Sequence, residues 1–380
     1  MTDLPVPSSS LRQRSAELSQ RIRAEIEASG GWIGFDRYMQ RALYEPGLGY
    51  YSGGGEKFGP RGDFLTAPEL GDVLAQAVVA QFADLLNRFD EPIVFELGAG
   101  SGKLAADCLD ALDARGMTEV RYLILEPSAS LKARQQRRLE RFGTRVEWLS
   151  ALPSKPFDGL VLANEVVDAL PAQRFLVHGS GVRPLGVAVE SDGFIWAEGD
   201  PDPGLTQALE ALQTELESPL PDSYRSELRL VLGAWIASIT ASLRRGALLC
   251  IDYGLVRREY YHAERSDGTL VCHYRHRTHA DPFYLPGLQD ISAWVDFSAL
   301  ADACREAGLE LAGFTTQGMF LVEVCARLPG DTLRLADPRV TSALRTLVLP
   351  GEMGERFKLL LATRGCETLE LAGRDFRNRL

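Results

Sequence analysis

The chain has 380 residues, enough for one large domain with insertions or for two domains, and its 45% hydrophobic content is that of a globular protein. Its net charge of −11 argues against a general nucleic-acid binder, because phosphate contacts need clustered Lys and Arg. The six cysteines form no C-x-x-C pair, which indicates buried thiols of a reducing compartment. The N-terminus has no apolar h-region, and no uncharged apolar run reaches about 18 residues. We therefore expect a cytoplasmic protein without membrane insertion and without a nucleic-acid partner.

Near the N-terminus, apolar residues at helical spacing predict a helix over residues 11–29 that stops at Ser29-Gly30. The Gly, Pro and Tyr-rich stretch 42–69 follows, and a loop of this length is usually functional or disordered. Its five aromatic residues argue against disorder. We predict an ordered lid, after which Pro68 opens a helix running to about Asn87.

Strand and helix patterns then alternate, which predicts a doubly wound α/β fold with a mainly parallel, seven-stranded sheet of the Rossmann-like kind. The predicted elements are strands at 92–97, 120–126, 146–148 and 157–165, with helices at 102–115 and 128–141.

Short strands over 172–198 and helices at 203–215 and 224–243 predict an inserted cap. The core resumes with strand 246–254, helix 297–307, strand 309–315 and the run 356–365. The expected domains are an N-terminal lid (1–90), a nucleoside-binding half (91–170), a cap (171–243) and a second core half (244–380).

FELGAGSGK (95–103) lies between a strand and a helix, so it is a glycine turn at a helix N-terminus. A phosphate-binding Walker loop is excluded, because Leu97 replaces its first glycine and Leu104 its hydroxyl residue. A dinucleotide fingerprint is weakened, because Lys103 stands at its final glycine position. An acid ahead of alternate glycines resembles motif I of the class I S-adenosylmethionine methyltransferases: Glu96, Gly98, Gly100 and Gly102. Glu96 can meet a positively charged amino-acid tail, which a dinucleotide lacks.

The second strand, VRYLILEPS (120–128), ends in Glu126, and an acid there can accept hydrogen bonds from two ribose hydroxyls. Dinucleotide enzymes share this feature, so Glu126 indicates a nucleoside-binding half without choosing the cofactor.

LANEVVDALP (162–171) follows the fourth strand, where a methyl acceptor would meet the donor. On a helical turn Asp168 would share a face with Glu165, and the two carboxylates could clamp a cationic nucleophile. An arginine acceptor, whose pKa is above about 12, must lose a proton as it reacts, and these carboxylates could receive it. The alternative is that Asn164 and Asp168 cap a short helix.

VCHYRHRTHA (271–280) holds a cysteine and three histidines, which suggests a zinc site. The interleaved arginines oppose a metal charge, and neither C-x-x-C nor H-E-x-x-H is present. We predict a loop without a metal ion, which leaves open the role of His273, His276 and His279.

Several stretches together resemble the MidA-type methyltransferases, from about residue 21 to 363. The most specific are GDFLTAPE, NEVVDALP and PGLQDISAWVDF, beside FELGAGSGK, ILEPSASLKARQQRRL and GALLCIDYG. The resemblance implies an S-adenosyl-L-methionine cofactor and methylation of an arginine in a partner protein. Mitochondrial members assist assembly of respiratory complex I by dimethylating an arginine of a core subunit, so a respiratory subunit is an implied partner.

The resemblance also implies roles for single residues. The three glycines would hold the methionine part of the cofactor and Glu126 its ribose, Asp63 and Thr66 would close over it from the lid, and Glu96, Leu149 and Asn164 complete the cofactor set. Asn164, Glu165 and Asp168 match the NE-x-x-DALP motif and would line the acceptor side. The chain departs from the family at Ala99 and at Val166-Val167, which affects the acceptor pocket.

We therefore expect a methyltransferase, as a monomer or homodimer, that acts on protein arginine. The alternatives are a methyltransferase for a small molecule or another side chain, a non-catalytic assembly factor that retains the cofactor, and a nicotinamide oxidoreductase.

Overall fold

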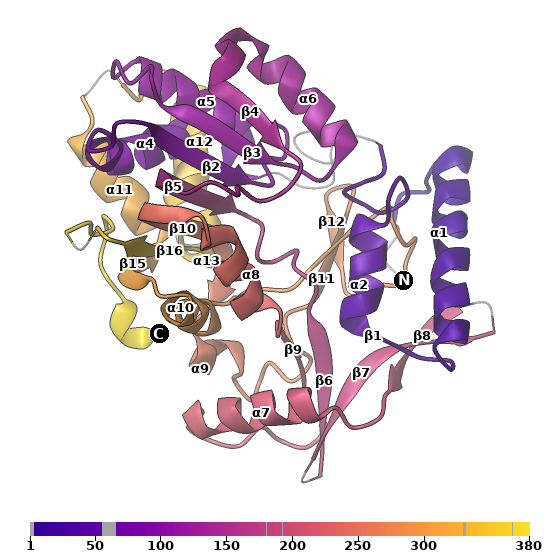
Figure 1. Ribbon diagram of the computed structural model, residues 1–380. Coiled ribbons are helices and arrows are strands. Elements are labelled where there is room, and N and C mark those ends of the chain that lie inside the picture. Colours follow the sequence, from indigo (N-terminus) through magenta and orange to yellow (C-terminus); the bar gives the residue numbers. More distant parts are fainter. Residues whose placement is uncertain (1–3, 55–65, 180, 192, 330–331, 367) are drawn as a thin grey trace. The chain divides into compact units, whose positions relative to one another are not determined.

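The computed structural model describes residues 4–54, 66–179, 181–191, 193–329, 332–366 and 368–380. The chain forms two compact units (Figure 1). Unit 1 comprises residues 1–64, 168–232 and 255–296, and unit 2 comprises residues 65–167, 233–254 and 297–380.

Unit 2 is built on a sheet whose strands lie in the order β15-β16-β10-β5-β2-β3-β4. The five strands from β10 to β4 are parallel, and β16 is antiparallel to both of its neighbours. This confirms the predicted doubly wound, mainly parallel fold. The strands are β2 (Pro92–Leu97), β3 (Arg121–Leu125), β4 (Val146–Leu149), β5 (Phe157–Asn164), β10 (Leu243–Leu255), β15 (Glu310–Thr316) and β16 (Phe357–Arg364).

Helices cover both faces of this sheet because its strands are apolar on both sides. On one face, Val94 and Leu162 of the sheet belong to a buried cluster with Phe82 of α4, Leu109 of α5 and residues of α11 and α12. On the other face, Phe297 of α10 packs on Phe314 of β15, with ring centroids 5.3 Å apart. The helices are α3 (Ala67–Leu70), α4 (Val73–Leu86), α5 (Lys103–Asp113), α6 (Ala129–Leu139), α8 (Leu232–Thr240), α10 (Phe297–Glu306), α11 (Gln317–Arg327), α12 (Pro338–Val348) and α13 (Met353–Arg356).

Unit 1 contains an antiparallel sheet in the order β1-β7-β6-β9, with β8 beside β7, and a small sheet in the order β12-β11-β13. Its strands are β1 (Ile33–Gly34), β6 (Gln173–His178), β7 (Gly181–Glu190), β8 (Gly193–Glu198), β9 (Arg225–Leu228), β11 (Val271–Tyr274), β12 (Arg277–His279), β13 (Asp290–Ser292) and the short β14 (Val295–Asp296). Its helices are α1 (Ser9–Ala28), α2 (Phe35–Tyr44), α7 (Pro203–Glu215) and α9 (Arg257–Tyr260).

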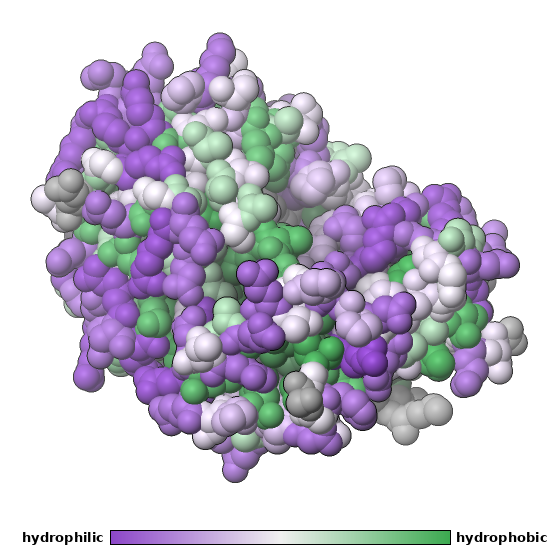
Figure 2. Space-filling view, turned by 60° about the horizontal axis from the view of Figure 1, so that its bottom comes forward, coloured by the Kyte–Doolittle hydropathy of each residue, from purple (hydrophilic) through white to green (hydrophobic). Residues whose placement is uncertain are grey.

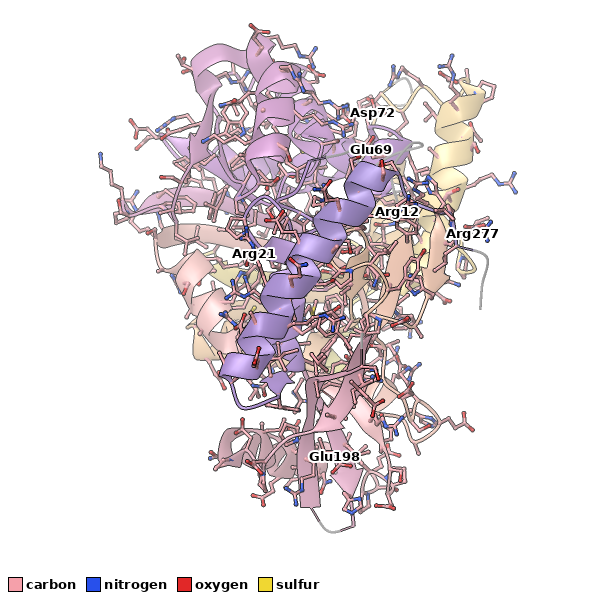
Figure 3. The ribbon with its side chains drawn as sticks, turned by 90° about the vertical axis from the view of Figure 1, so that its right-hand side faces the viewer. Arg12, Arg21, Glu69, Asp72, Glu198 and Arg277 are labelled. Atoms are coloured by element: carbon pink, nitrogen blue, oxygen red, sulfur yellow. The ribbon has the colours of Figure 1, made fainter. Side chains whose placement is uncertain are left out.

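The N-terminal helix confirms the periodicity prediction, since Leu18, Ile22 and Ile26 of α1 are buried. Figure 3 shows α1 along its length, with Arg12 and Arg21 on it; the Arg21 guanidinium lies 3.0 Å from the Glu45 carboxylate. One predicted helix, 224–243, is wrong in its first half. Residues 225–228 form β9, which pairs with β6, and only α8 is helical. Pairing with a distant strand overrode the local helical pattern there.

Hydrophilic residues predominate on the face drawn in Figure 2, with apolar residues in smaller groups between them. Among the described residues, no helix combines the length and apolar character needed to cross a membrane.

The sheet of unit 2 depends on glycine where β5 meets its neighbours. A Cβ on Gly159 of β5 would lie 1.8 Å from the Ile93 carbonyl oxygen of β2. We expect Gly159→Ala to lower the free energy of unfolding by more than about 3 kcal/mol, because the backbones must separate. Urea denaturation measures this, with Gly351→Ala, at a glycine in open space, as the control. Equal stability of the two variants would contradict the prediction.

Candidate functional site

The carboxyl ends of β2 and β5 meet at the point where the strand order of unit 2 reverses. From β2 the chain continues outward to β3 and β4, whereas β5 continues on the opposite side to β10. Ligands of open α/β sheets bind in the crevice outside such a switch point. The glycine turn follows β2, and Asn164 ends β5.

The backbone of the glycine turn is left-handed, a conformation that residues other than glycine adopt only with strain. Gly98, Gly100 and Gly102 have φ of 60°, 52° and 77°. A Cβ on Gly102 would also lie 3.2 Å from the Cγ of Gln135 on α6. Glycine is therefore needed for the turn itself and for close packing on α6, and α5 begins at Lys103 with its N-terminal N–H groups at the switch point.

Glu96 is 2% exposed and accepts a hydrogen bond of 2.8 Å from the hydroxyl of Tyr122. The pKa of Glu96 is raised to about 8: burial is the main cause, the hydrogen bond from Tyr122 opposes it, and the charge of Glu126 adds to it. A cation bound beside Glu96 would stabilise its carboxylate form.

Glu126 lies at the end of β3 and is also buried. Its Oε1 accepts a hydrogen bond of 2.9 Å from the backbone N–H of Ser128, and its Oε2 accepts one of 2.9 Å from Gln135 Nε2. No sequence pattern indicates Gln135, because its contact with Glu126 arises only when α6 packs on the sheet.

The turn after β5 is not the predicted helix. Glu165 has φ of 53°, which is uncommon for a residue other than glycine and incompatible with an α-helix. The backbone N–H of Glu165 donates to the Ile251 carbonyl (2.8 Å), and that of Val167 donates to Asp252 Oδ2 (3.0 Å). Glu165 and Asp168 are therefore not on one helical face, and Asp252 anchors this turn.

Asn164 offers a polar atom suited to a ligand. Its Nδ2 donates to Glu165 Oε1 (3.3 Å), whereas its Oδ1 is buried and accepts no hydrogen bond from the part of the chain that the structure describes. An unsatisfied buried acceptor is costly, so a donor such as an ammonium group would fit here.

Asp168 lies in unit 1 and is held through its backbone. Its carbonyl accepts hydrogen bonds from the Ala293 N–H (3.2 Å) and from Arg229 Nη2 (2.8 Å). The same guanidinium donates to the Trp294 carbonyl (2.7 Å). Arg229 therefore ties the Asp168 turn to the segment 293–294, a contact that the sequence did not indicate.

Two tyrosines and a second buried carboxylate lie beside this turn. Tyr44 donates to the Ala169 carbonyl (2.9 Å), and its ring stacks on Tyr51 at 5.5 Å. Tyr51 donates to Asp290 Oδ1 (2.9 Å). Burial, followed by the charges of Asp290 and Asp168, raises the pKa of Tyr51 well above its usual value. Asp168 and Asp290 are 5% and 2% exposed, so two carboxylates from distant segments share one buried polar region.

The histidine segment is a β-hairpin rather than the predicted loop. Arg275 and His276, with φ of 48° and 61°, form the two-residue turn between β11 and β12. Cys272 pairs with His279, so His273 lies on the opposite face of the hairpin, where its Nδ1 is 3.8 Å from Asp290 Oδ2. Among the described residues, no three or more His, Cys, Asp or Glu side chains are grouped to hold a metal ion.

Three predicted cofactor residues remain: Leu149, Thr66 and Asp63. Leu149 ends β4 and pairs with Leu125 of β3, so it lies at the same sheet edge as Glu126. Thr66 is buried at the N-cap of α3 without a capping side-chain bond. Asp63 lies outside the described residues.

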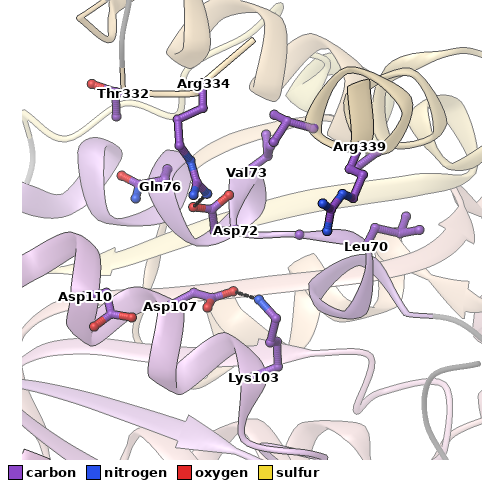
Figure 4. A pocket seen from close by; sticks show the side chains of 13 residues that line it. Leu70, Asp72, Val73, Gln76, Lys103, Asp107, Asp110, Thr332, Arg334 and Arg339 are labelled. Atoms are coloured by element: carbon purple, nitrogen blue, oxygen red, sulfur yellow. Dashed lines mark hydrogen bonds and ion pairs between the residues drawn. The ribbon is translucent and has the colours of Figure 1, made fainter. Parts of the chain in front are cut away.

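A cavity of about 480 Å³ lies beside α5 in unit 2 (Figure 4). Arg334 pairs with Asp72 there (2.8 Å), and Lys103 pairs with Asp107. The charged residues that line it are three cations and three carboxylates: Lys103, Arg334, Arg339, Asp72, Asp107 and Asp110. Because these charges balance, the cavity has no excess charge that would select an anion or a cation.

Known proteins match this chain well beyond the sequence motifs. The profile of a family described as S-adenosyl-L-methionine-dependent methyltransferase matches residues 73–315. A Burkholderia thailandensis protein, whose crystal structure contains bound S-adenosyl-homocysteine, has 38% sequence identity to this chain. Its structure matches with a TM-score of 0.90, and the match covers 100% of both chains. Curated relatives include the protein arginine methyltransferase NDUFAF7 homolog, mitochondrial, of Drosophila melanogaster (29% identical, 94% of this chain and 87% of the relative). The mouse protein arginine methyltransferase NDUFAF7, mitochondrial, is 27% identical over 87% of this chain and 80% of its own.

The predicted cytoplasmic location is contradicted by these relatives, which are named as mitochondrial proteins. The prediction depended on the absence of an apolar h-region, which marks secretory signals. Mitochondrial transit peptides are amphipathic and Arg-rich, so this test does not detect a mitochondrial address.

The raised pKa of Glu96 predicts a pH dependence of stability without ligand. Its carboxyl ionises near pH 4.5 in the unfolded chain and near pH 8 in the folded one. Ionisation of the unfolded chain therefore favours unfolding in this window, and stability falls as the pH rises through it. Relative to Glu96→Gln, we expect the wild type to lose up to about 1.4 kcal/mol per pH unit between about pH 5 and pH 8 in urea denaturation. A difference that does not change with pH would contradict this.

Proposed function

Because the chain belongs to the S-adenosyl-L-methionine-dependent methyltransferase family, as its MidA-type motifs predicted, we propose that it methylates an arginine of a partner protein. The cofactor is S-adenosyl-L-methionine, which supplies an electrophilic methyl group on a sulfonium. The observation that carries the choice of a cationic acceptor is the pair of buried carboxylates, Asp168 and Asp290, beside Tyr51. The names of the curated relatives support arginine as that acceptor.

The donor side of the proposal uses groups at the switch point of unit 2. Glu126 would accept bonds from the ribose hydroxyls, because its carboxylate is held at the end of β3 by Ser128 and Gln135. Glu96 and the buried Oδ1 of Asn164 would receive the cationic amino-acid tail. The glycine turn would admit the methionine part, with Leu149 at the neighbouring sheet edge and Thr66 and Asp63 assigned to the lid.

The acceptor side uses Asn164, Glu165 and Asp168. A carboxylate oriented toward the guanidinium nitrogen would align it and receive its proton as the N–C bond forms and the C–S bond breaks. By resemblance to the mitochondrial relatives, a respiratory complex subunit is the proposed partner.

Calorimetric titration with S-adenosyl-L-methionine tests the donor site. We expect saturable binding by the wild type and none by Gly100→Val, because a valine at φ of 52° is strained and distorts the turn. Gly308→Val, at a glycine with φ of 75° in open space, is the control for backbone strain alone. Near-UV circular dichroism verifies folding. Equal affinity of a folded Gly100→Val protein would overturn the assignment of the turn.

The acceptor residues are tested by Glu165→Gln and Asp168→Asn. Each substitution removes a charge and a proton acceptor, so we expect turnover to fall by at least about 100-fold while cofactor affinity changes less than about threefold. The measurement is mass spectrometry of arginine methylation in a mitochondrial membrane extract, with calorimetry on the same proteins. Full function of both variants with intact cofactor binding would favour a non-catalytic assembly factor.

A further inference from the structure

Gln135 of α6 connects the glycine turn, the β3 carboxylate and a tryptophan of β4. We propose that Gln135 is a positioning residue that orients Glu126 toward the cofactor ribose and fixes the glycine turn against α6. The inference rests on the proposed function, in which Glu126 binds the ribose.

The hydrogen bonds of Gln135 determine how its amide is turned. Its Oε1 accepts a bond of 3.0 Å from Trp148 Nε1, which can only donate. Its Nε2 therefore faces two acceptors, the Gly100 carbonyl at 3.0 Å and Glu126 Oε2 at 2.9 Å. The amide thus has a partner for each donor and for its acceptor, and it has one favourable orientation.

A glutamine is unexpected at this position on packing grounds alone. Gln135 is 0% exposed and lies between Leu131 and Leu139, which form the buried face of α6. An apolar side chain would continue that face, whereas a buried amide must recover its lost hydration through hydrogen bonds. Here those bonds go to the glycine turn and to the carboxylate expected to bind the ribose.

The same helix holds the glycine turn at a second point. Arg138, one turn after Gln135, donates a hydrogen bond of 2.8 Å to Ser101 Oγ. The Cγ of Gln135 occupies the space that a side chain on Gly102 would need. Residues 100 to 102 are therefore fixed by α6, and the carboxylate of Glu126 is held between Gln135 and the Ser128 N–H, each donating to one oxygen.

Fixing both carboxylate oxygens favours recognition of two neighbouring hydroxyls, because a carboxylate that rotates loses conformational entropy on binding them. The proposal therefore predicts that Gln135 acts on affinity for the ribose hydroxyls, rather than on affinity for the cofactor in general.

The test compares S-adenosyl-homocysteine with its 2′-deoxy and 3′-deoxy analogues by calorimetry. The hydroxyl penalty is the loss of affinity when either ribose hydroxyl is missing. For Gln135→Met, which keeps the side-chain length, we expect about tenfold weaker binding of S-adenosyl-homocysteine and a smaller hydroxyl penalty than in the wild type. Gln136→Met changes the neighbouring exposed position of α6 and is expected to behave as the wild type. An unchanged hydroxyl penalty in Gln135→Met overturns the inference.

Two further variants separate the inference from the proposed function. If Glu126→Gln keeps the wild-type hydroxyl penalty, the assignment of Glu126 to the ribose fails. If Glu126→Gln loses that penalty and Gln135→Met retains it, only the positioning role fails. Trp148→Phe removes the donor that orients the amide, so it should reduce the penalty in the same direction. If Gln135→Met does not fold, Trp148→Phe provides the test instead. A hydroxyl penalty in Trp148→Phe equal to that of the wild type would then overturn the inference.

Discussion

The parallel pairing of β2 with β5 is the contact on which the rest of unit 2 depends. It runs in register from Pro92 opposite Asp158 to Leu97 opposite Ala163, and it places the glycine turn next to Asn164. Gly159 permits this pairing, because any side chain there would overlap the β2 backbone. The neighbouring positions of the glycine turn and Asn164 at the switch point follow from that contact.

Around this contact the protein maintains several locally unfavourable features. Glu165 has a left-handed backbone, Glu96 is a carboxyl group in an apolar interior, and Gln135 is an amide on a buried helix face. Such strain and burial persist only where the surrounding structure over-determines them. Hydrogen bonds from other elements provide that constraint: Ile251 holds the Glu165 backbone, Tyr122 bonds Glu96, and Trp148 bonds Gln135. Unfavourable local structure concentrated at one sheet edge is typical of functional sites.

The sequence predicts a residue's position correctly where that position follows from its own segment. Gly98 and Glu126 stand at the ends of strands that the apolar pattern located, and the structure places those strands as neighbours. The sequence does not predict the local conformation where a hydrogen-bond partner from a distant segment decides it. The Glu165 turn was predicted as helical, but the Glu165 N–H bonds to β10 and the Val167 N–H to Asp252. His273, His276 and His279 were separated by a hairpin turn that spacing alone did not indicate.

The sequence by itself determined the α/β alternation, the glycine turn and the family, because strand periodicity and motif spacing are local properties of the chain. Only the tertiary structure decided that Gln135 holds Glu126, that Tyr51 donates to Asp290 and that Tyr44 donates to the Asp168 turn. These contacts join residues from separate elements, and no pattern within one segment encodes which side chains meet. The physical reason is that packing of whole elements, driven by apolar burial, brings their polar side chains together.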